Sequence, residues 1–211
     1  MHDTLVIDSA TEACSVALIN QHGVAAGDWQ LLGRGHAEQL IPMIAALPGR
    51  GRANRIAVAR GPGSFTGLRV GLAAARALAL AWGCELAGYP TLALIAAQAR
   101  AEAGGGPVSV VTTGGHGEWF VQTYGEDGTA LAPLASLPPE AAIAAAAATT
   151  VAGSQAEAVI ARRGYGRALP LWPDARAFAL LPSVLLTAKT APLYGRAPDA
   201  RLPGGLPVGT A

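Results

Sequence analysis

Residues 61 to 69 form the segment whose residue types and spacing come nearest to a recognisable chemical site. The sequence Gly-Pro-Gly-Ser-Phe-Thr-Gly-Leu-Arg lies between a short apolar run and a long helical pattern. Backbone N–H groups of a glycine-rich loop at a helix N-terminus attract anions, so phosphate binding is the first chemistry to test. The loop itself consists of Gly61, Pro62, Gly63, Ser64, Phe65, Thr66 and Gly67.

The spacing within this loop differs from that of three common site motifs. A Walker A loop needs a second glycine where Thr66 stands, followed by a lysine. The dinucleotide pattern fails at the same residue, and Pro62 removes a backbone donor. Ser64 is flanked at two residues' distance by Pro62 and Thr66, whereas a nucleophile elbow has glycines there. We therefore predict a structural loop that shapes the backbone, and no catalytic residue.

Arg69 is unusual because a cation in the first turn of a helix opposes the helix dipole, at a cost of some tenths of a kcal/mol. A negative group is therefore expected close to it. Two alternatives stay open: an internal salt bridge to Asp8 or Glu12, or a functional anion or partner.

The elements that position these residues follow from hydrophobic periodicity, with period two indicating strands and period 3.6 indicating helices. We expect strands at 4–7, 14–19, 24–30, 55–59, 85–88, 108–112, 118–124, 131–134, 150–152 and 169–172. We expect helices at 36–47, 68–82, 91–103, 139–148, 155–163 and 175–181.

The glycine-rich segment 104–107 separates two halves that each run strands, helix, strand, helix. Three glycines and a proline are typical of a boundary. The sequence thus predicts a duplicated α/β architecture with lobes at 1–103 and 104–211, each containing an antiparallel meander. The tail from about residue 190 is expected to extend along the surface or fray.

Two predicted helices have surfaces that suit helix-to-helix packing. Gly71 and Ala75 lie one turn apart among further alanines, and the helix at 36–47 is apolar on two sides. Packing inside one lobe and docking of a partner protein are both open alternatives. The candidate interface residues are His36, Leu40, Ile41, Ile44, Arg69, Gly71, Leu72, Ala75 and Arg76.

Composition narrows the class of protein. A chain of 211 residues with 51% hydrophobic and 14% charged residues has ample material for a core. A net charge of +1 predicts no general attraction to nucleic acid or an anionic membrane. The apolar runs are shorter than a membrane span, and the start lacks the pattern of a signal peptide. Two distant cysteines favour a reduced, cytoplasmic setting.

No metal site is predicted. The four histidines, His2, His22, His36 and His116, are isolated, so no pair has the spacing that aims two imidazoles at one ion. His36, near a helix start, is expected to be a structural or interface residue.

Three segments, in order, carry a resemblance to a known family. They are Ile-Asp-Ser-Ala-Thr-Glu-Ala-Cys-Ser-Val-Ala-Leu at 7–18, His-Ala-Glu-Gln-Leu-Ile-Pro at 36–42, and Gly-Pro-Gly-Ser-Phe-Thr-Gly-Leu-Arg-Val-Gly-Leu at 61–72. At each of them the chain resembles the bacterial TsaB family of the glycoprotease-like superfamily. The likeness is close over about the first 95 residues. It is looser afterwards, through Glu118 and Pro-Leu-Tyr-Gly-Arg at 192–196.

The resemblance implies a two-lobed, actin-like and Hsp70-like fold. It also implies a complex with TsaD and TsaE that transfers threonylcarbamoyl to the adenine next to the anticodon of ANN-decoding tRNAs. In that family TsaD is catalytic and TsaB supports it. The chain would then need no cofactor of its own, with ATP and metal on partner subunits and tRNA bound through the complex. A homodimer is expected in isolation.

One segment departs from the family pattern. TsaB relatives usually have Asp-Ala-Arg shortly before the residue matching Glu118, whereas this chain has Thr113, Gly114 and Gly115 there. The family's two charges are absent at this place.

An actin-like ATPase would use two glycine-containing phosphate hairpins with an Asp that acts on the metal. The first candidate keeps Asp8 and Thr11 but has Ala10 in place of a glycine. The second, Asp-Gly-Thr at 127–129, has the composition of an ordinary hairpin turn. The residues therefore predict a vestigial nucleotide site at Asp8 and Thr11, without hydrolysis.

Two alternatives to the scaffold hypothesis remain. One is a weak ATPase or glycoprotease-like hydrolase. The other is direct tRNA binding through Arg50, Arg52, Arg55 and Arg60, although such clusters are usually solvated surfaces.

Overall fold

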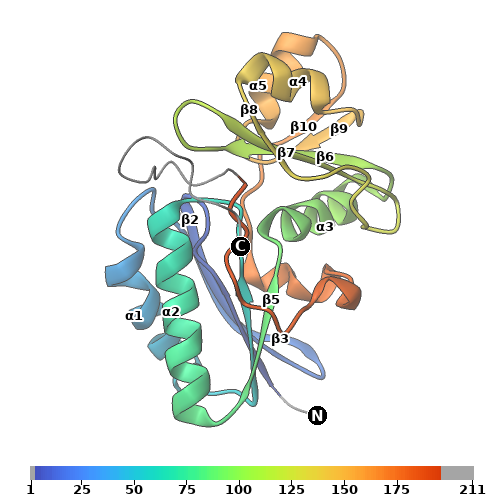
Figure 1. The fold of residues 1–211 in the computed structure, drawn as a ribbon. Helices are drawn as coiled ribbons and strands as arrows, with labels where there is room; N and C mark the ends of the chain where they lie inside the picture. The colour runs from blue at the N-terminus through green and yellow to red at the C-terminus, as the bar shows by residue number, and fades with distance from the viewer. Residues whose placement is uncertain (1–2, 196–211) are drawn as a thin grey trace, which may run out of the picture.

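Two five-stranded mixed sheets with the same topology form the framework (Figure 1). The computed structural model describes residues 3–195. The first sheet has the order β3-β2-β1-β4-β5. Its strands are β1 (Thr4–Asp8), β2 (Ala13–Asn20), β3 (Gly23–Leu31), β4 (Arg55–Ala59) and β5 (Glu85–Tyr89).

The second sheet repeats this plan with the order β8-β7-β6-β9-β10. Its strands are β6 (Val108–Thr113), β7 (Trp119–Tyr124), β8 (Ala135–Leu137), β9 (Thr150–Ala152) and β10 (Arg167–Leu169). In both sheets the first three strands form an antiparallel meander, and the last two run parallel to the first. The predicted duplicated α/β fold is confirmed.

The helices cover both sheets (Figure 1). They are α1 (His36–Ala46), α2 (Phe65–Trp82), α3 (Thr91–Ala103), α4 (Pro139–Ala145) and α5 (Ala156–Arg163), with 3-10 helices η1 (Pro48–Gly51), η2 (Ala175–Leu180) and η3 (Ser183–Leu185). α1 and α2 pack on one face of the first sheet. α4 and α5 pack on the face of the second sheet that points away from the first.

The helix that comes after the last strand of each sheet packs on the other sheet. α3 follows β5 but contacts β6, β7 and β9, whereas η2 follows β10 but contacts β1, β2 and β3. α3 and η2 also contact each other, so one hydrophobic core runs through both sheets. We propose that the chain divides at Gly104 into a first and a second lobe, with residues 175–195 returning to the first.

Most predicted elements are present, and several differ in their bounds or type. α4 ends at Ala145 rather than at residue 148, and the helix expected at 175–181 is the 3-10 helix η2 (Ala175–Leu180). α2 begins at Phe65 rather than Leu68, because the Ser64 hydroxyl accepts a bond from the Gly67 N–H at 3.3 Å and caps the helix. The strand expected at 131–134 is β8 at 135–137, since the chain around Ala130 is still turning beside Tyr124. The strand expected at 169–172 is β10 at 167–169.

The expected surface course of the tail is seen as far as the structure describes it. Within residues 190–195, the Leu193 N–H donates to the Arg60 carbonyl at 2.6 Å. The remainder of the predicted tail, including Arg196, lies outside the described residues.

Length and composition alone would allow α2 to cross a membrane. In the structure it lies on the first sheet with one side buried and with Arg69 and Arg76 exposed on another. The buried residues are Gly67, Leu68, Gly71, Leu72, Ala75 and Ala79. α2 is therefore packed as a cover helix of the sheet.

Glycines at every fourth position allow α2 and its preceding loop to press onto the turn after β1. A Cβ atom on Gly63 would overlap the Ala10 carbonyl oxygen, and one on Gly67 would overlap the Ser9 carbonyl oxygen. A Cβ on Gly71 would overlap the Ser9 hydroxyl. Two hydrogen bonds hold this contact: Ser64 N–H to the Ala10 carbonyl at 2.6 Å and Ser9 hydroxyl to the Gly67 carbonyl at 2.8 Å. The predicted structural role of the loop thus has a physical explanation.

Replacing Gly63 by Ala should destabilise the protein by at least about 2 kcal/mol, because the added methyl group meets backbone atoms that cannot move aside. Urea unfolding followed by circular dichroism measures this. The matched control is Gly115→Ala, where no heavy atom lies within 4 Å of the added carbon and a change within about 0.5 kcal/mol is expected. Equal stabilities of the two variants would contradict the proposed close contact.

Candidate functional site

A cleft of about 510 Å³ opens between the lobes, where the loop at 61–67 faces the turn between β6 and β7. Three parts of the chain line it: the first lobe around Thr11 and Phe65, the second lobe around Gly114 and Phe120, and the last described residues. The lining residues are Thr11, Glu12, Gly33, Gly63, Ser64, Phe65, Arg69, Thr113, Gly114, Gly115, His116, Phe120, Ser136, Leu193, Tyr194 and Gly195.

Asp8 does not line this cleft. Its side chain is fully buried, and its carboxylate oxygens accept bonds from the Ala10 N–H at 3.1 Å and the Tyr89 hydroxyl at 3.2 Å. Burial raises the pKa of Asp8 to about 7, against the opposing effect of these two hydrogen bonds. The close-packed turn and loop separate this carboxyl group from the cleft, so it cannot act on a ligand there.

Thr11, the other residue of the predicted vestigial nucleotide site, does reach the cleft. Its hydroxyl accepts a bond from the Ala13 N–H at 3.2 Å within its own turn. The structure thus separates the two predicted residues, one in the core and one at the cleft. Within residues 3–195 no group of three His, Cys, Asp or Glu side chains could hold a metal ion.

Arg69 faces the cleft next to aromatic rings. Its guanidinium lies 3.4 Å above the Phe65 ring, and Nη2 is 3.4 Å from the Tyr194 hydroxyl. The rings of Phe65 and Tyr194 stack with centroids 6.3 Å apart. Of the two alternatives left open for Arg69, the salt bridge to Asp8 or Glu12 is not among the ion pairs of residues 3–195: Asp8 is buried beside Tyr89, and Glu12 accepts a bond from the Trp172 indole at 3.3 Å.

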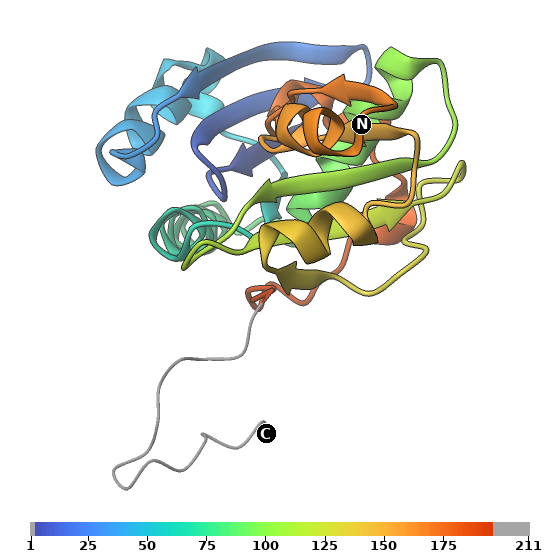
Figure 2. The same ribbon diagram turned by 90° about the horizontal axis from the view of Figure 1, so that it is seen from above.

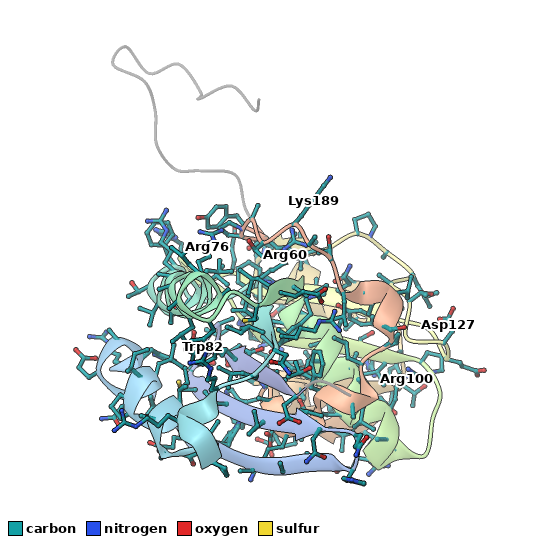
Figure 3. All side chains as sticks on the ribbon, turned by 90° about the horizontal axis from the view of Figure 1, so that it is seen from below. Arg60, Arg76, Trp82, Arg100, Asp127 and Lys189 are labelled. Carbon is teal, nitrogen blue, oxygen red and sulfur yellow. The ribbon has the colours of Figure 1, made fainter. Side chains whose placement is uncertain are left out.

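Residues 187–195, here named the C-terminal strap, run along β5 and α2 to the cleft. Thr187 pairs with Gly88 through two backbone bonds. Arg76 donates to the Thr190 carbonyl at 2.8 Å, and Arg60 donates to the Ala191 carbonyl at 2.9 Å. Figures 2 and 3 show that the described chain ends at the surface of the molecule, and Figure 3 shows Arg60 and Arg76 nearby. Sequence patterns gave no signal for these contacts beyond the family-like segment at 192–196.

The second-lobe wall of the cleft is a network of uncharged groups where the family usually carries Asp and Arg. The Thr113 hydroxyl lies 3.2 Å from the Ser154 hydroxyl and accepts from the Gln155 amide at 2.9 Å. The Gly114 N–H donates to the Glu118 carbonyl at 2.8 Å, which closes the turn. Glu118 itself accepts a bond from Ser136 at 2.7 Å.

The interface predicted from sequence needs correction at six residues. Six of its members are buried in the chain's own core, three on α1 and three on the small-residue face of α2 that packs on the first sheet: His36, Leu40, Ile44, Gly71, Leu72 and Ala75. The His36 ring lies 3.3 Å from the Ala13 carbonyl, which fits the expected structural role. Ile41, Arg69 and Arg76 are exposed.

A different set of residues on α1 and α2 faces outward. Leu80 is 87% exposed and Ile41 is 50% exposed, and the same two helices carry further exposed alanines. Steps of 100° per residue place Ala73, Ala77 and Leu80 on the side of α2 opposite the sheet. We name this surface the outer apolar face; it consists of Ile41, Ala45, Ala73, Ala77, Leu80 and Ala81.

The structure also divides the predicted arginine cluster. Arg50 and Arg52 precede β4 and Arg55 begins it, whereas Arg60 follows its end and contacts the strap. A whole strand separates Arg60 from the other three.

Comparison with known protein families shows to which family the chain belongs. The family model described as "TsaD: tRNA N6-adenosine threonylcarbamoyltransferase" matches residues 30–175, most of the chain. The chain belongs to the TsaD family. Within it, the predicted resemblance to TsaB is confirmed by 38% identity over 128 residues to the tRNA threonylcarbamoyladenosine biosynthesis protein TsaB of Escherichia coli.

That alignment covers 58% of this chain and 55% of the E. coli protein, so the chain spans about half the length of the curated TsaB relative. An uncharacterized protein of Mycobacterium tuberculosis is 32% identical over 93% of both chains. The solved structure of YeaZ from Pseudomonas aeruginosa superposes with a TM-score of 0.75 at 29% identity. The superposition covers 92% of this chain and 100% of the YeaZ chain. The predicted actin-like fold is thereby confirmed.

The buried Asp8 predicts a pH dependence of stability. Its carboxyl group ionises near pH 4 in the unfolded chain but only near pH 7 in the folded one, so the folded state binds the extra proton between these values. The free energy of unfolding should therefore fall as pH rises from about 4 to about 7 and level off above. Each pKa unit corresponds to about 1.4 kcal/mol, so the fall amounts to a few kcal/mol.

Urea unfolding of wild type and Asp8→Asn across this pH range measures the effect. The difference between the two proteins should change with pH, because Asn has no proton to lose. Parallel pH profiles would contradict the prediction.

Proposed function

We propose that the chain is a non-catalytic subunit that acts with TsaD and TsaE in threonylcarbamoyl transfer to the adenine next to the anticodon of ANN-decoding tRNAs. TsaD-family membership and the similarity to E. coli TsaB support a role in this tRNA modification. The observation that carries a supporting role is the outer apolar face, which is exposed to solvent in the part of the chain that the structure describes.

The arrangement of carboxyl groups supports a non-catalytic role. Asp8 is enclosed and held by Tyr89, and Glu12 at the cleft is bonded to the Trp172 indole. No contact in the described structure favours the alternative of a weak ATPase or glycoprotease-like hydrolase. We expect ATP and metal to be held by the partner subunits in the cytoplasm.

The outer apolar face suits a partner helix. Alanines at 73, 77 and 81 let another backbone approach closely, and Leu80 offers a large apolar side chain to bury. Such a face can pair with TsaD, or with a second copy of this chain when TsaD is absent. The docking residues proposed here replace the buried ones inferred from sequence.

Leu80→Glu should reduce co-purification with TsaD by at least about tenfold, because a charge would be buried against an apolar helix. Threonylcarbamoyladenosine in tRNA, measured by mass spectrometry in cells that depend on this chain, should fall with it. The control is Leu131→Glu, the same change at a side chain 64% exposed in the second lobe. Intact association of Leu80→Glu with TsaD would refute this interface.

A further inference from the structure

One flank of α2 differs in chemistry from the outer apolar face. At 100° per residue, Phe65, Arg69 and Arg76 lie within about 40° of one another around the helix axis. The strap adds Lys189 and Tyr194 beside them, and Arg60 reaches the strap from the end of β4. Figure 3 shows Arg60, Arg76 and Lys189 on one side of the molecule. We name this surface the basic flank.

The positive charges of the basic flank are not neutralised within residues 3–195. The salt bridges of the described chain use other arginines, namely Arg162, Arg167 and Arg176. Arg60 and Arg76 donate to backbone carbonyls of the strap, which carry no charge. Each guanidinium has five N–H donors, so most of them stay available to a further acceptor.

The distribution of charge points to an anionic partner. The chain's formal net charge is only +1, so four cations on the basic flank leave the rest of the chain net negative. An approaching polyanion is therefore attracted to this flank and repelled elsewhere. The positive charge that would attract such a partner is therefore local, as a sequence with little overall charge requires.

Two exposed aromatic rings lie among these cations. Phe65 is 58% exposed and Tyr194 is 48% exposed, and they stack on each other beside Arg69. Cations that bind phosphates, interleaved with rings that stack on unpaired bases, are the usual means by which proteins hold single-stranded RNA loops.

We propose that the basic flank binds the phosphates and an unpaired base of an RNA loop, with Arg60, Arg69, Arg76 and Lys189 at phosphates and the Phe65–Tyr194 pair against the base. This inference rests on the proposed function, because the RNA would be the anticodon loop of the tRNA being modified. The centre of the flank is turned about 80° around α2 from the centre of the outer apolar face, and the two surfaces meet where Arg76 and Leu80 lie one turn apart. RNA and TsaD would therefore occupy adjoining surfaces of the helix.

The test uses the full chain, alone and with TsaD, and a fluorescent anticodon stem-loop RNA of an ANN-decoding tRNA. Binding is followed by anisotropy from about 50 to 200 mM salt. The variant Arg69→Gln/Arg76→Gln/Lys189→Gln should bind at least about tenfold more weakly. The slope of log affinity against log salt should fall by about two to three, because each phosphate contact contributes about 0.7 to 0.9.

Two further variants separate charge from stacking. Arg50→Gln/Arg52→Gln/Arg167→Gln removes the same charge elsewhere and should change affinity less than about threefold. Phe65→Ala should weaken binding about tenfold with an unchanged salt slope, since stacking releases no counterions. Circular dichroism melting confirms that each variant is folded.

The inference is overturned if the two triple variants lose affinity equally, or if neither the chain nor its TsaD complex binds the RNA. Flank-dependent binding to vesicles of anionic phospholipid without RNA binding would also overturn it. Co-purification with TsaD, measured in parallel, distinguishes failure of RNA binding by the basic flank from failure of TsaD docking on the outer apolar face. Loss of RNA affinity with retained TsaD association supports the flank, whereas failure of the Leu80 experiment leaves the RNA result unaffected.

Discussion

The close contact between the loop at 61–67 and the turn after β1 is the constraint on which the rest of the site depends. Two backbone segments approach so tightly at Gly63 and Gly67 that a single methyl group would not fit. This contact covers Asp8, which then sits in the core with a pKa near 7 and with Tyr89 as partner. It also fixes where α2 begins. Phe65 and Arg69 therefore point toward the cleft, and the glycine and alanine side of the helix points toward the sheet.

Much of this fold could be predicted from the sequence, because the strands and helices have clear periodic patterns and Gly or Pro at their ends. The same patterns could not say which way a small-residue face points. Gly71 and Ala75 have the spacing of a docking surface, yet they pack on Ser9 and the first sheet, since small residues suit any close contact. The periodicity identified the small-residue face of α2 correctly, but side-chain size alone could not distinguish an internal contact from a docking surface.

The parts that sequence analysis missed all depend on contacts between distant residues. Nothing local indicates that α3 and η2 each pack on the sheet of the other lobe. Likewise, the carbonyl groups that hold Arg60 and Arg76 lie more than a hundred residues further along the chain. Arg69 was correctly singled out as a cation that opposes the helix dipole, but its aromatic neighbours include Tyr194, which no pattern could place beside it.

The contacts in the cleft and on α2 indicate which surfaces are available for recognition of partners. In the cleft, hydroxyl and amide groups stand where the family usually has charges, and the carboxylates nearby are buried or bonded to protein groups. Two exposed surfaces lie on α2 instead: the outer apolar face, and the basic flank, whose Phe65, Arg69 and Tyr194 also line the cleft. A helix whose inner side is fixed by glycine contacts keeps both outer surfaces in a constant orientation. We infer that the glycine contacts hold α2 in place, and that recognition of partners takes place on the exposed sides of the same helix.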